Sequence, residues 1–298
     1  MGRGASSNGS AIGWRAATLA PAVAVYALLA LLPIVNLLTM SVHDIRWDQG
    51  VAQWAFVGIK HFVALPADPL LRAGAANTLV FAVAAVALEM AIGLALAVLV
   101  SRAPFGRVAY RAIFILPILI PGIVIGAIWK LMYHPDFGVI NQLAGLVGMT
   151  GHDWLGDSKL ALASVIVVDV WHWTPFVFLL MLAAIESLPT DVDEAAQIDG
   201  AGAWQTFRYV TFPMLLPAFA VTLAFRLIVS FKVFDEVYLL TGGGPGTATE
   251  VVSFSIYRRF FTEDRMGYGS AISVVTLFVL ALVIVLLLGA ARRRDFQR

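Results

Sequence analysis

Two long apolar segments enclose one short polar stretch, Glu194-Ala195-Ala196-Gln197-Ile198-Asp199-Gly200. Thr190 can cap a helix over this stretch, and Asp193 follows three residues later, which is the spacing of a capping box. Gly200 suits the position just after the last turn of a helix, where the backbone turns left-handed. The stretch therefore predicts a short polar helix that ends at a tight turn outside the bilayer.

After this turn we expect a second short helix, from about Gly202 to Val210, which Pro213 interrupts. Small and acidic residues share the faces of the two helices. The alanines are Ala195, Ala196, Ala201 and Ala203, and the acids are Asp191, Asp193, Glu194 and Asp199. Small side chains let another surface approach closely, and acids offer partners to Arg or Lys. From chemistry alone, a docking segment and an amphipathic connecting loop both remain open.

The composition is that of a membrane protein. Of the 298 residues, 60% are hydrophobic and only 13% are charged, whereas soluble domains carry about 25% charged residues. The net charge of +1 provides no basic field for nucleic acid. With no cysteine, the chain has no disulfide, thiolate metal site or cysteine nucleophile, and its five histidines lack metal-ligand spacing.

Six apolar runs predict six transmembrane helices, because each approaches or exceeds the ~20 residues needed to cross a ~30 Å hydrocarbon core. The runs are about 17–41, 77–101, 108–133, 160–184, 214–240 and 268–291. The first run is too long for a signal peptide and lacks a cleavage site, so we interpret it as a retained span. The chain thus divides into a tail (1–16), a membrane domain (17–291) with a loop (186–213) between spans four and five, and a second tail (292–298).

Lys and Arg predict the orientation. With a cytoplasmic N-terminus, the inner segments hold ten basic residues, namely Arg3, Arg15, Arg102, Arg107, Arg111, Arg208, Arg292, Arg293, Arg294 and Arg298. The outer segments hold seven, namely Arg46, Lys60, Arg72, Lys159, Arg258, Arg259 and Arg265. This excess follows the positive-inside rule, so both termini and the Glu194 loop are expected in the cytoplasm.

The spacing Glu194-Ala195-Ala196, Gly200, Val210 and Phe212-Pro213 resembles the EAA motif, the signature loop of permease subunits in bacterial ABC importers. Val210 and Phe212 replace the usual Ile and Leu and keep the apolar character. Further stretches resemble the maltose and glycerol-phosphate branch of carbohydrate importers. These are Phe114-Ile115-Leu116-Pro117 with Pro121, Trp129, Trp171-His172-Trp173-Thr174-Pro175-Phe176, Ile198-Asp199-Gly200-Ala201, Phe234-Asp235 and Thr241-Gly242-Gly243-Gly244-Pro245.

The resemblance implies an all-α protein of the bacterial inner membrane, with six spans and a cytoplasmic coupling helix between spans four and five. It implies half of a translocation pathway for a carbohydrate or polyol. The expected partners are a second, paralogous permease, two ATPase subunits that bind ATP and Mg, and an extracytoplasmic solute-binding protein. The residues expected to couple to the ATPase are Glu194, Ala195, Ala196, Asp199, Gly200 and Pro213.

Ionisable residues within spans are candidate sites, because they are costly in a bilayer. Asp169, Trp173 and Phe176 share one helix face, and Arg226 and Ser230 share a face of the next span. A carboxylate and a guanidinium can bind sugar hydroxyls, and an aromatic ring can cover the apolar face of a sugar. The resemblance implies substrate contact at these five positions. The alternative is that Asp169 and Arg226 simply pair with each other.

The other ionisable residues in spans favour structural roles. Lys232, near the outer end of span five, is expected either to snorkel toward the membrane surface or to form an ion pair with Asp235 or Glu236 at i+3 or i+4. Glu89 is interpreted as a hydrogen bond between helices, and His172 as packing beside two tryptophans.

No phosphate-binding Gly-x4-Gly-Lys-Ser/Thr motif is present in the sequence, so an ATPase must be a separate polypeptide. The chain also lacks His-Glu-x-x-His and Gly-x-Ser-x-Gly, so an intramembrane enzyme has no support. A secondary transporter that relays ions or protons through its membrane charges remains as an alternative, although such proteins often contain an internal repeat and none is evident between the two halves.

Overall fold

The computed structural model describes residues 7–103, 105–148 and 150–295. The two predicted tails, 1–16 and 292–298, lie partly outside these residues. The side chains of Thr190 and Asp193, which the predicted capping box requires, also lie outside them. Within the described chain almost all regular structure is helical, which confirms the predicted all-α class, and one two-stranded hairpin is added to it.

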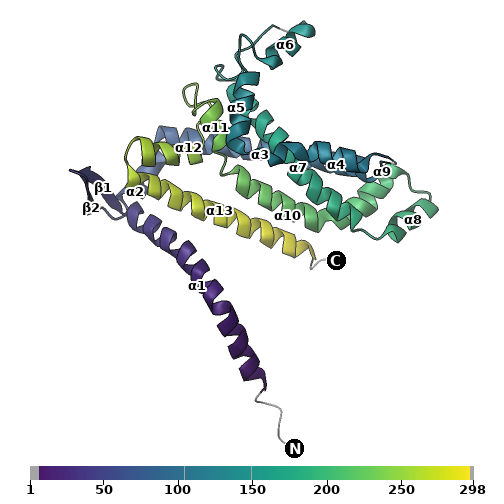
Figure 1. Cartoon of the computed structure of the whole chain (residues 1–298), viewed down its shortest axis with the longest axis horizontal. Helices are drawn as coiled ribbons and strands as arrows, with labels where there is room; N and C mark the ends of the chain where they lie inside the picture. Colours follow the sequence, from purple (N-terminus) through teal and green to yellow (C-terminus); the bar gives the residue numbers. More distant parts are fainter. Residues whose placement is uncertain (1–6, 104, 149, 296–298) are drawn as a thin grey trace, which may run out of the picture. The chain divides into compact units, whose positions relative to one another are not determined.

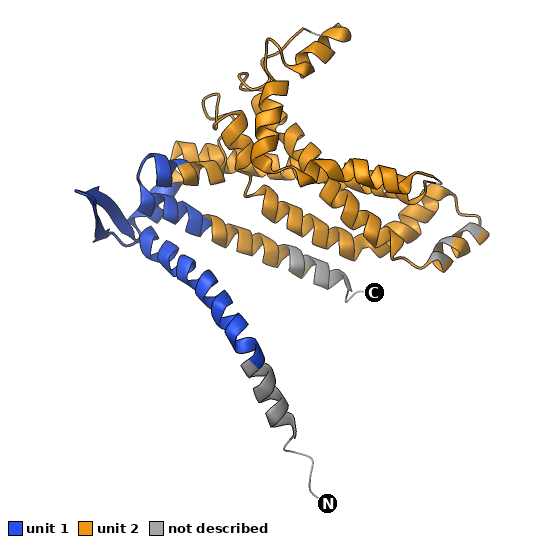
Figure 2. Ribbon diagram, viewed as in Figure 1, with its two compact units in different colours: residues 1–65, 258–275 blue, residues 66–257, 276–298 orange. Residues whose placement is uncertain are grey.

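Two compact units divide the chain, and Figure 2 colours them separately. The first comprises residues 1–65 and 258–275, and the second comprises residues 66–257 and 276–298. Helix α13 (Met266–Asp295) belongs to the first unit as far as Val275.

The first unit is built on α1, whose side chains from Thr18 onward are exposed along almost the whole helix. Its other elements are a hairpin, a short helix and a π-helical turn. In chain order these elements are α1 (Ser7–Ser41), β1 (His43–Asp48), β2 (Val51–Phe56), α2 (Lys60–Ala64) and η4 (Arg258–Thr262). Exposed apolar side chains on a long helix are expected where lipid is the solvent.

The second unit is a helical bundle, whose elements are labelled in Figure 1. Its first part contains η1 (Leu65–Ala67), α3 (Pro69–Ser101), α4 (Arg107–Ile115), η2 (Leu116–Leu119), α5 (Gly122–Met132), α6 (Val139–Leu146) and α7 (Ala161–Glu186). Its second part contains α8 (Thr190–Ile198), α9 (Ala203–Thr206), η3 (Phe207–Thr211), α10 (Phe212–Ser230), α11 (Asp235–Leu240) and α12 (Val252–Tyr257).

Helices α3 and α7 form the main packing contact of this unit, and α10 packs against both. Two buried apolar clusters result, one including Phe81 and Val165 and the other including Val86 and Phe178. Gly93 permits the close approach, since a Cβ atom built there would lie 2.7 Å from Val177 Cβ. Small residues at such contacts are typical of helix packing in membranes.

Replacing Gly93 by alanine is expected to lower the free energy of unfolding by about 1–3 kcal/mol, because the added methyl group forces α3 and α7 apart. The matched control is Gly145→Ala in α6, where a Cβ atom would meet nothing within 4 Å. Thermal unfolding in detergent, followed by tryptophan fluorescence, compares the two variants. Equal midpoints would show that the contact at Gly93 is not tight.

Among the described residues, five helices are long and apolar enough to cross a membrane. They are Thr18–Ser41, Pro69–Ser101, Ala161–Glu186, Ala203–Leu240 and Met266–Leu286. The remaining predicted run, 108–133, corresponds to two helical segments, Arg107–Leu119 and Gly122–Met132. The two segments are bent by 95° relative to each other. Ile120 and Pro121 are extended at the break, because a proline disfavours helical geometry in the residue before it.

Candidate functional site

Helix α8 carries the polar stretch and ends as its glycine predicts. Gly200 has a φ of 79°, in the left-handed region. The Asp199 N–H donates to the Ala195 carbonyl at 3.0 Å, and the Ala201 N–H donates to the Ala196 carbonyl at 2.9 Å. The second bond closes a Schellman motif, which satisfies carbonyls that the helix end leaves free. A Cβ atom at Gly200 would meet nothing within 4 Å, so only the backbone conformation requires glycine within this chain.

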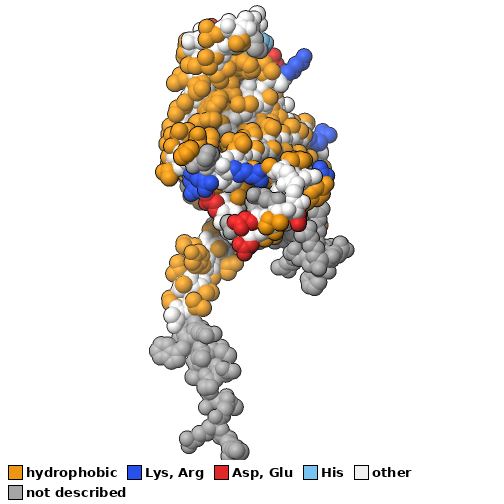
Figure 3. All heavy atoms as spheres, turned by 90° about the vertical axis from the view of Figure 1, so that its right-hand side faces the viewer, with side chains coloured by type: hydrophobic (Ala, Val, Ile, Leu, Met, Phe, Trp, Pro, Cys, Tyr) orange, Lys and Arg blue, Asp and Glu red, His pale blue; other side chains and the backbone are white. Residues whose placement is uncertain are grey.

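The surface of α8 is largely open. Ala196 is buried and α8 contacts η3, whereas Glu194, Ala195 and Asp199 are exposed and Ile198 is 86% exposed. Figure 3 shows acidic and basic side chains gathered at the end of the second unit that carries α8. This face of α8 is therefore open to another surface.

The helix after this turn differs from the prediction that Pro213 would interrupt it. The chain passes from α9 through the π-helical turn η3 and continues as α10, with Pro213 in the first turn of α10. Proline is tolerated there because an N–H in the first turn has no partner within its own helix. Helical turns therefore run without a break from Ala203, just after α8, to Ser230.

An ion pair between α4 and α7 lies close in the chain to the start of α8. Arg111 of α4 forms an ion pair with Glu186, the last residue of α7. Glu186 precedes the first residue of α8 by only a few positions. This ion pair therefore joins the middle of α4 to the end of α7, four residues before α8 begins.

Deep in the bundle, three helices contribute a buried charge cluster. Arg226 of α10 donates from Nε and Nη2 to both carboxylate oxygens of Glu89, at 2.5 and 2.6 Å. Its Nη2 also donates to Asp169 Oδ2 of α7 at 3.0 Å. All three side chains are almost completely buried. The predicted pairing of Asp169 with Arg226 is confirmed, and Glu89, which we had interpreted as a simple hydrogen bond between helices, makes the bidentate contact.

Trp173 lies against this cluster. The Arg226 guanidinium carbon is 4.4 Å from the centroid of the Trp173 ring, which is a cation–π contact. Phe176 stacks on Phe225 at 4.8 Å and packs with the second apolar cluster. Ser230 Oγ and Arg226 Nη1 are buried polar atoms without a hydrogen-bond partner among the described residues.

A polar cavity of about 340 Å³ opens on the other side of Trp173. It lies between α5, α7 and the α10–α11 junction. Its lining residues are Gly122, Asp169, His172, Trp173, Val229, Lys232, Val233, Phe234, Asp235 and Glu236. Of the five residues predicted to contact substrate, Asp169 and Trp173 line this cavity, whereas Phe176, Arg226 and Ser230 do not.

Two local predictions near the cavity were wrong. Glu236 faces His172, with Oε1 3.3 Å from Nδ1, and both side chains are buried. Lys232 forms no ion pair within the described part of the chain, so the predicted pairing with Asp235 or Glu236 is absent there. The reason is that α10 ends at Ser230 and α11 begins at Asp235, so the helical spacing assumed for these residues is broken.

Comparison with known proteins shows the family to which this chain belongs. Residues 89–294 match the family described as "Binding-protein-dependent transport system inner membrane component". The chain is 42% identical over 228 residues to "Probable ABC transporter permease protein y4oQ" of Sinorhizobium fredii, covering 76% of this chain and 74% of that protein. It is 34% identical over 277 residues to the trehalose/maltose transport system permease MalF of Thermococcus litoralis, covering 92% of each.

A solved structure of a bacterial ABC transporter that imports the acidic polysaccharide alginate shares the fold. The TM-score is 0.82 at 24% sequence identity, over 93% of this chain and 94% of that chain. The matched region contains the charge cluster, the polar cavity and α8.

Proposed function

Since this chain belongs to the binding-protein-dependent transport system inner membrane components, and is a multi-pass membrane permease of ABC importer type, we propose how its two sites divide the work. The chain forms half of a translocation pathway for a carbohydrate, the cavity beside Trp173 contacts the substrate, and α8 receives the movement of an ATPase. The observation that carries the proposal is that α9, η3 and α10 run without a break from Ala203, just after α8, to the residues around Val229, which lines the cavity.

The cavity suits a sugar. Trp173 provides a flat apolar surface, which matches the apolar face of a sugar ring. Asp169, Asp235 and Glu236 provide carboxylates that accept hydrogen bonds from hydroxyl groups, and Lys232 provides a donor. A relative named as a trehalose/maltose permease supports the same class of substrate.

We further propose that the substrate is uncharged. Arg226 is the cation closest to Trp173, but Glu89 and Asp169 already hold it. Three carboxylates line the cavity against one lysine and one histidine. An anionic sugar would therefore meet repulsion rather than a free guanidinium.

Coupling would pass from α8 to the cavity through the backbone. An ATPase subunit, which holds ATP and Mg, would bind the exposed face of α8. Glu194 would form an ion pair with a basic residue of the ATPase. Because η3 contacts α8 and leads directly into α10, displacement of α8 would move Arg226 and with it Trp173. A second, paralogous permease would complete the pathway, and an extracytoplasmic binding protein would deliver the sugar. The positive-inside pattern supports a cytoplasmic position for both termini and for α8.

Replacing Trp173 by leucine is expected to raise the half-saturating sugar concentration for uptake about 3- to 10-fold, since one ring contact contributes about 0.5–1.5 kcal/mol. Trp171→Leu is the matched control, because Trp171 lies two residues away and packs on Trp129 outside the polar cavity. The measurement is uptake of labelled maltose and trehalose into proteoliposomes that hold the complete transporter. Equal effects in the two variants would contradict a sugar contact at Trp173.

Competition tests the charge of the substrate. An excess of an unlabelled neutral disaccharide is expected to block uptake, whereas a uronic acid disaccharide is expected to leave it unchanged. Block by the uronic acid alone would overturn the proposed neutral substrate and leave the assignment as a permease intact.

A further inference from the structure

The hairpin in the first unit has two chemically different faces. Its turn, Gln49–Gly50, has positive φ at both residues, which is the geometry that joins two antiparallel strands with the correct twist. The register pairs His43 with Phe56, Ile45 with Trp54 and Trp47 with Ala52. Directly paired residues point to the same side of a hairpin, and alternate pairs point to opposite sides.

One side therefore carries aromatic and apolar groups, and the other carries polar and charged groups. The first side, called here the aromatic face, consists of His43, Ile45, Trp47, Ala52, Trp54 and Phe56. The opposite side consists of Asp44, Arg46, Asp48, Val51, Gln53 and Ala55. On this polar side Arg46 pairs with Asp44 at 3.2 Å.

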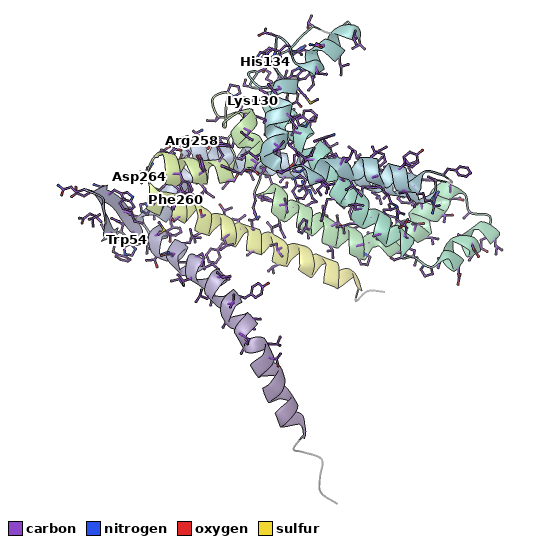
Figure 4. The ribbon with its side chains drawn as sticks, viewed as in Figure 1. Trp54, Lys130, His134, Arg258, Phe260 and Asp264 are labelled. Atoms are coloured by element: carbon purple, nitrogen blue, oxygen red, sulfur yellow. The ribbon has the colours of Figure 1, made fainter. Side chains whose placement is uncertain are left out.

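The three large rings of the aromatic face are exposed within the described structure, whereas Ile45 on the same face is buried. Phe56 is 74% exposed, Trp47 is 53% exposed and Trp54, labelled in Figure 4, is 48% exposed. His43 meets Trp54 and Phe56 edge to face, which orders the rings as one surface. Removing apolar surface from water stabilises a protein by about 25 cal/mol for each Å². Contact of these rings with an apolar partner is therefore favourable.

The hairpin is tied to the end of a membrane helix. Only Val42 separates α1 from β1, and the Val57 N–H donates to the Val42 carbonyl at 2.9 Å. His43 Nδ1 lies 2.7 Å from the Thr39 carbonyl of α1. The 24 residues Thr18–Ser41 span about 36 Å as a helix. Since that length matches the hydrocarbon core, the hairpin begins where the core ends.

We propose that the aromatic face inserts into the headgroup layer of the membrane and anchors the outer end of α1. Tryptophan rings concentrate at this depth because one edge is apolar and the N–H is polar. The exposed apolar side chains of α1 immediately precede this hairpin in the chain, and every charged residue of the hairpin lies on the other side. The occupant is therefore lipid, and the polar side faces water.

The chain offers a matched pair of reporters, because it contains no cysteine. Ala52 lies on the aromatic face and Ala55 lies on the polar side, three residues along the same strand. Ala52→Cys and Ala55→Cys, each carrying a nitroxide, are reconstituted as the complete transporter in vesicles of phosphatidylethanolamine and phosphatidylglycerol. Collision with oxygen, which concentrates in lipid, is compared with collision with a water-soluble nickel complex.

The ratio of oxygen to nickel accessibility is expected to exceed one at position 52 and to fall below one at position 55. Equal, nickel-dominated values at both positions would overturn the proposal. Shielding of position 52 that appears only after a solute-binding protein is added, or only at high protein density, would also overturn it, in favour of a protein partner or a second copy. Uptake by the same vesicles tests the transport function separately.

Discussion

Replacing Arg226 by methionine is expected to lower the free energy of unfolding by about 3–5 kcal/mol, because Glu89 and Asp169 then remain buried without their cation. Arg226 makes two hydrogen bonds to Glu89 and one to Asp169, and these three bonds join α3, α7 and α10. The midpoint of thermal unfolding in detergent is expected to fall by on the order of 10 °C.

Two further variants separate charge from packing. Arg46→Met removes an exposed arginine that also pairs with an aspartate, and its effect is expected to stay below about 1 kcal/mol. The double variant Arg226→Met with Glu89→Leu is expected to recover part of the loss, since it removes a buried carboxylate along with the cation. An Arg226→Met midpoint equal to that of Arg46→Met would show that the cluster contributes little.

Changing the exposed surface of α8 is expected to stop transport without unfolding the chain. Glu194→Lys places a cation where the proposed ATPase contact requires an anion. Loss of one partner of such a charge pair costs about 2–5 kcal/mol, which corresponds to a roughly 30-fold or greater loss of affinity. Gly200→Asp places a negatively charged side chain at the turn, where φ is 79° and aspartate is tolerated, so its effect is expected on the surface that docks there and not on the fold. Uptake is expected to fall to background while ATP hydrolysis no longer responds to substrate.

Gly200→Asn is the informative control. Asparagine tolerates the left-handed conformation, and within this chain its Cβ atom would meet nothing within 4 Å. Retained uptake in Gly200→Asn would show that a side chain fits at the turn and that the charge added by Gly200→Asp stops transport. Lost uptake would show that another surface approaches Gly200 closely. Wild-type uptake in both Glu194→Lys and Gly200→Asp, with the subunits still assembled, would remove α8 as the coupling site.

The sequence predicted the helices well, because apolar length and helix-ending residues act locally. The ranges of five of the six predicted spans lie within or close to long helical segments of the structure, and Gly200 ends α8 as expected. The sequence did not predict how Pro121 and Pro213 affect the helices that contain them. Pro121 lies at a 95° bend, whereas Pro213 is accommodated by a π-helical turn and does not interrupt its helix. Their different effects depend on neighbouring turns that no single residue reveals.

Within the candidate site, the sequence identified the charged residues but not their partners. Ion pairs between helices require proximity across the bundle, and Glu89 and Arg226 are 137 positions apart in the chain. The pairing of His172 with Glu236 spans 64 positions. The signal that could have found them was already present, since an unpaired charge within a span must find an opposite charge on another helix.

The sequence by itself determined the membrane class, the approximate spans, the turn at Gly200 and the membership of the permease family. Each of these depends on hydrophobicity, residue spacing or local backbone preference, and these properties can be read directly from the amino-acid sequence. Only the tertiary structure decided that Glu89 shares Arg226 with Asp169, that Asp169 belongs to this cluster and also lines the polar cavity, and that one face of the hairpin is aromatic. These features depend on which side chains converge from distant segments and on the register of two strands.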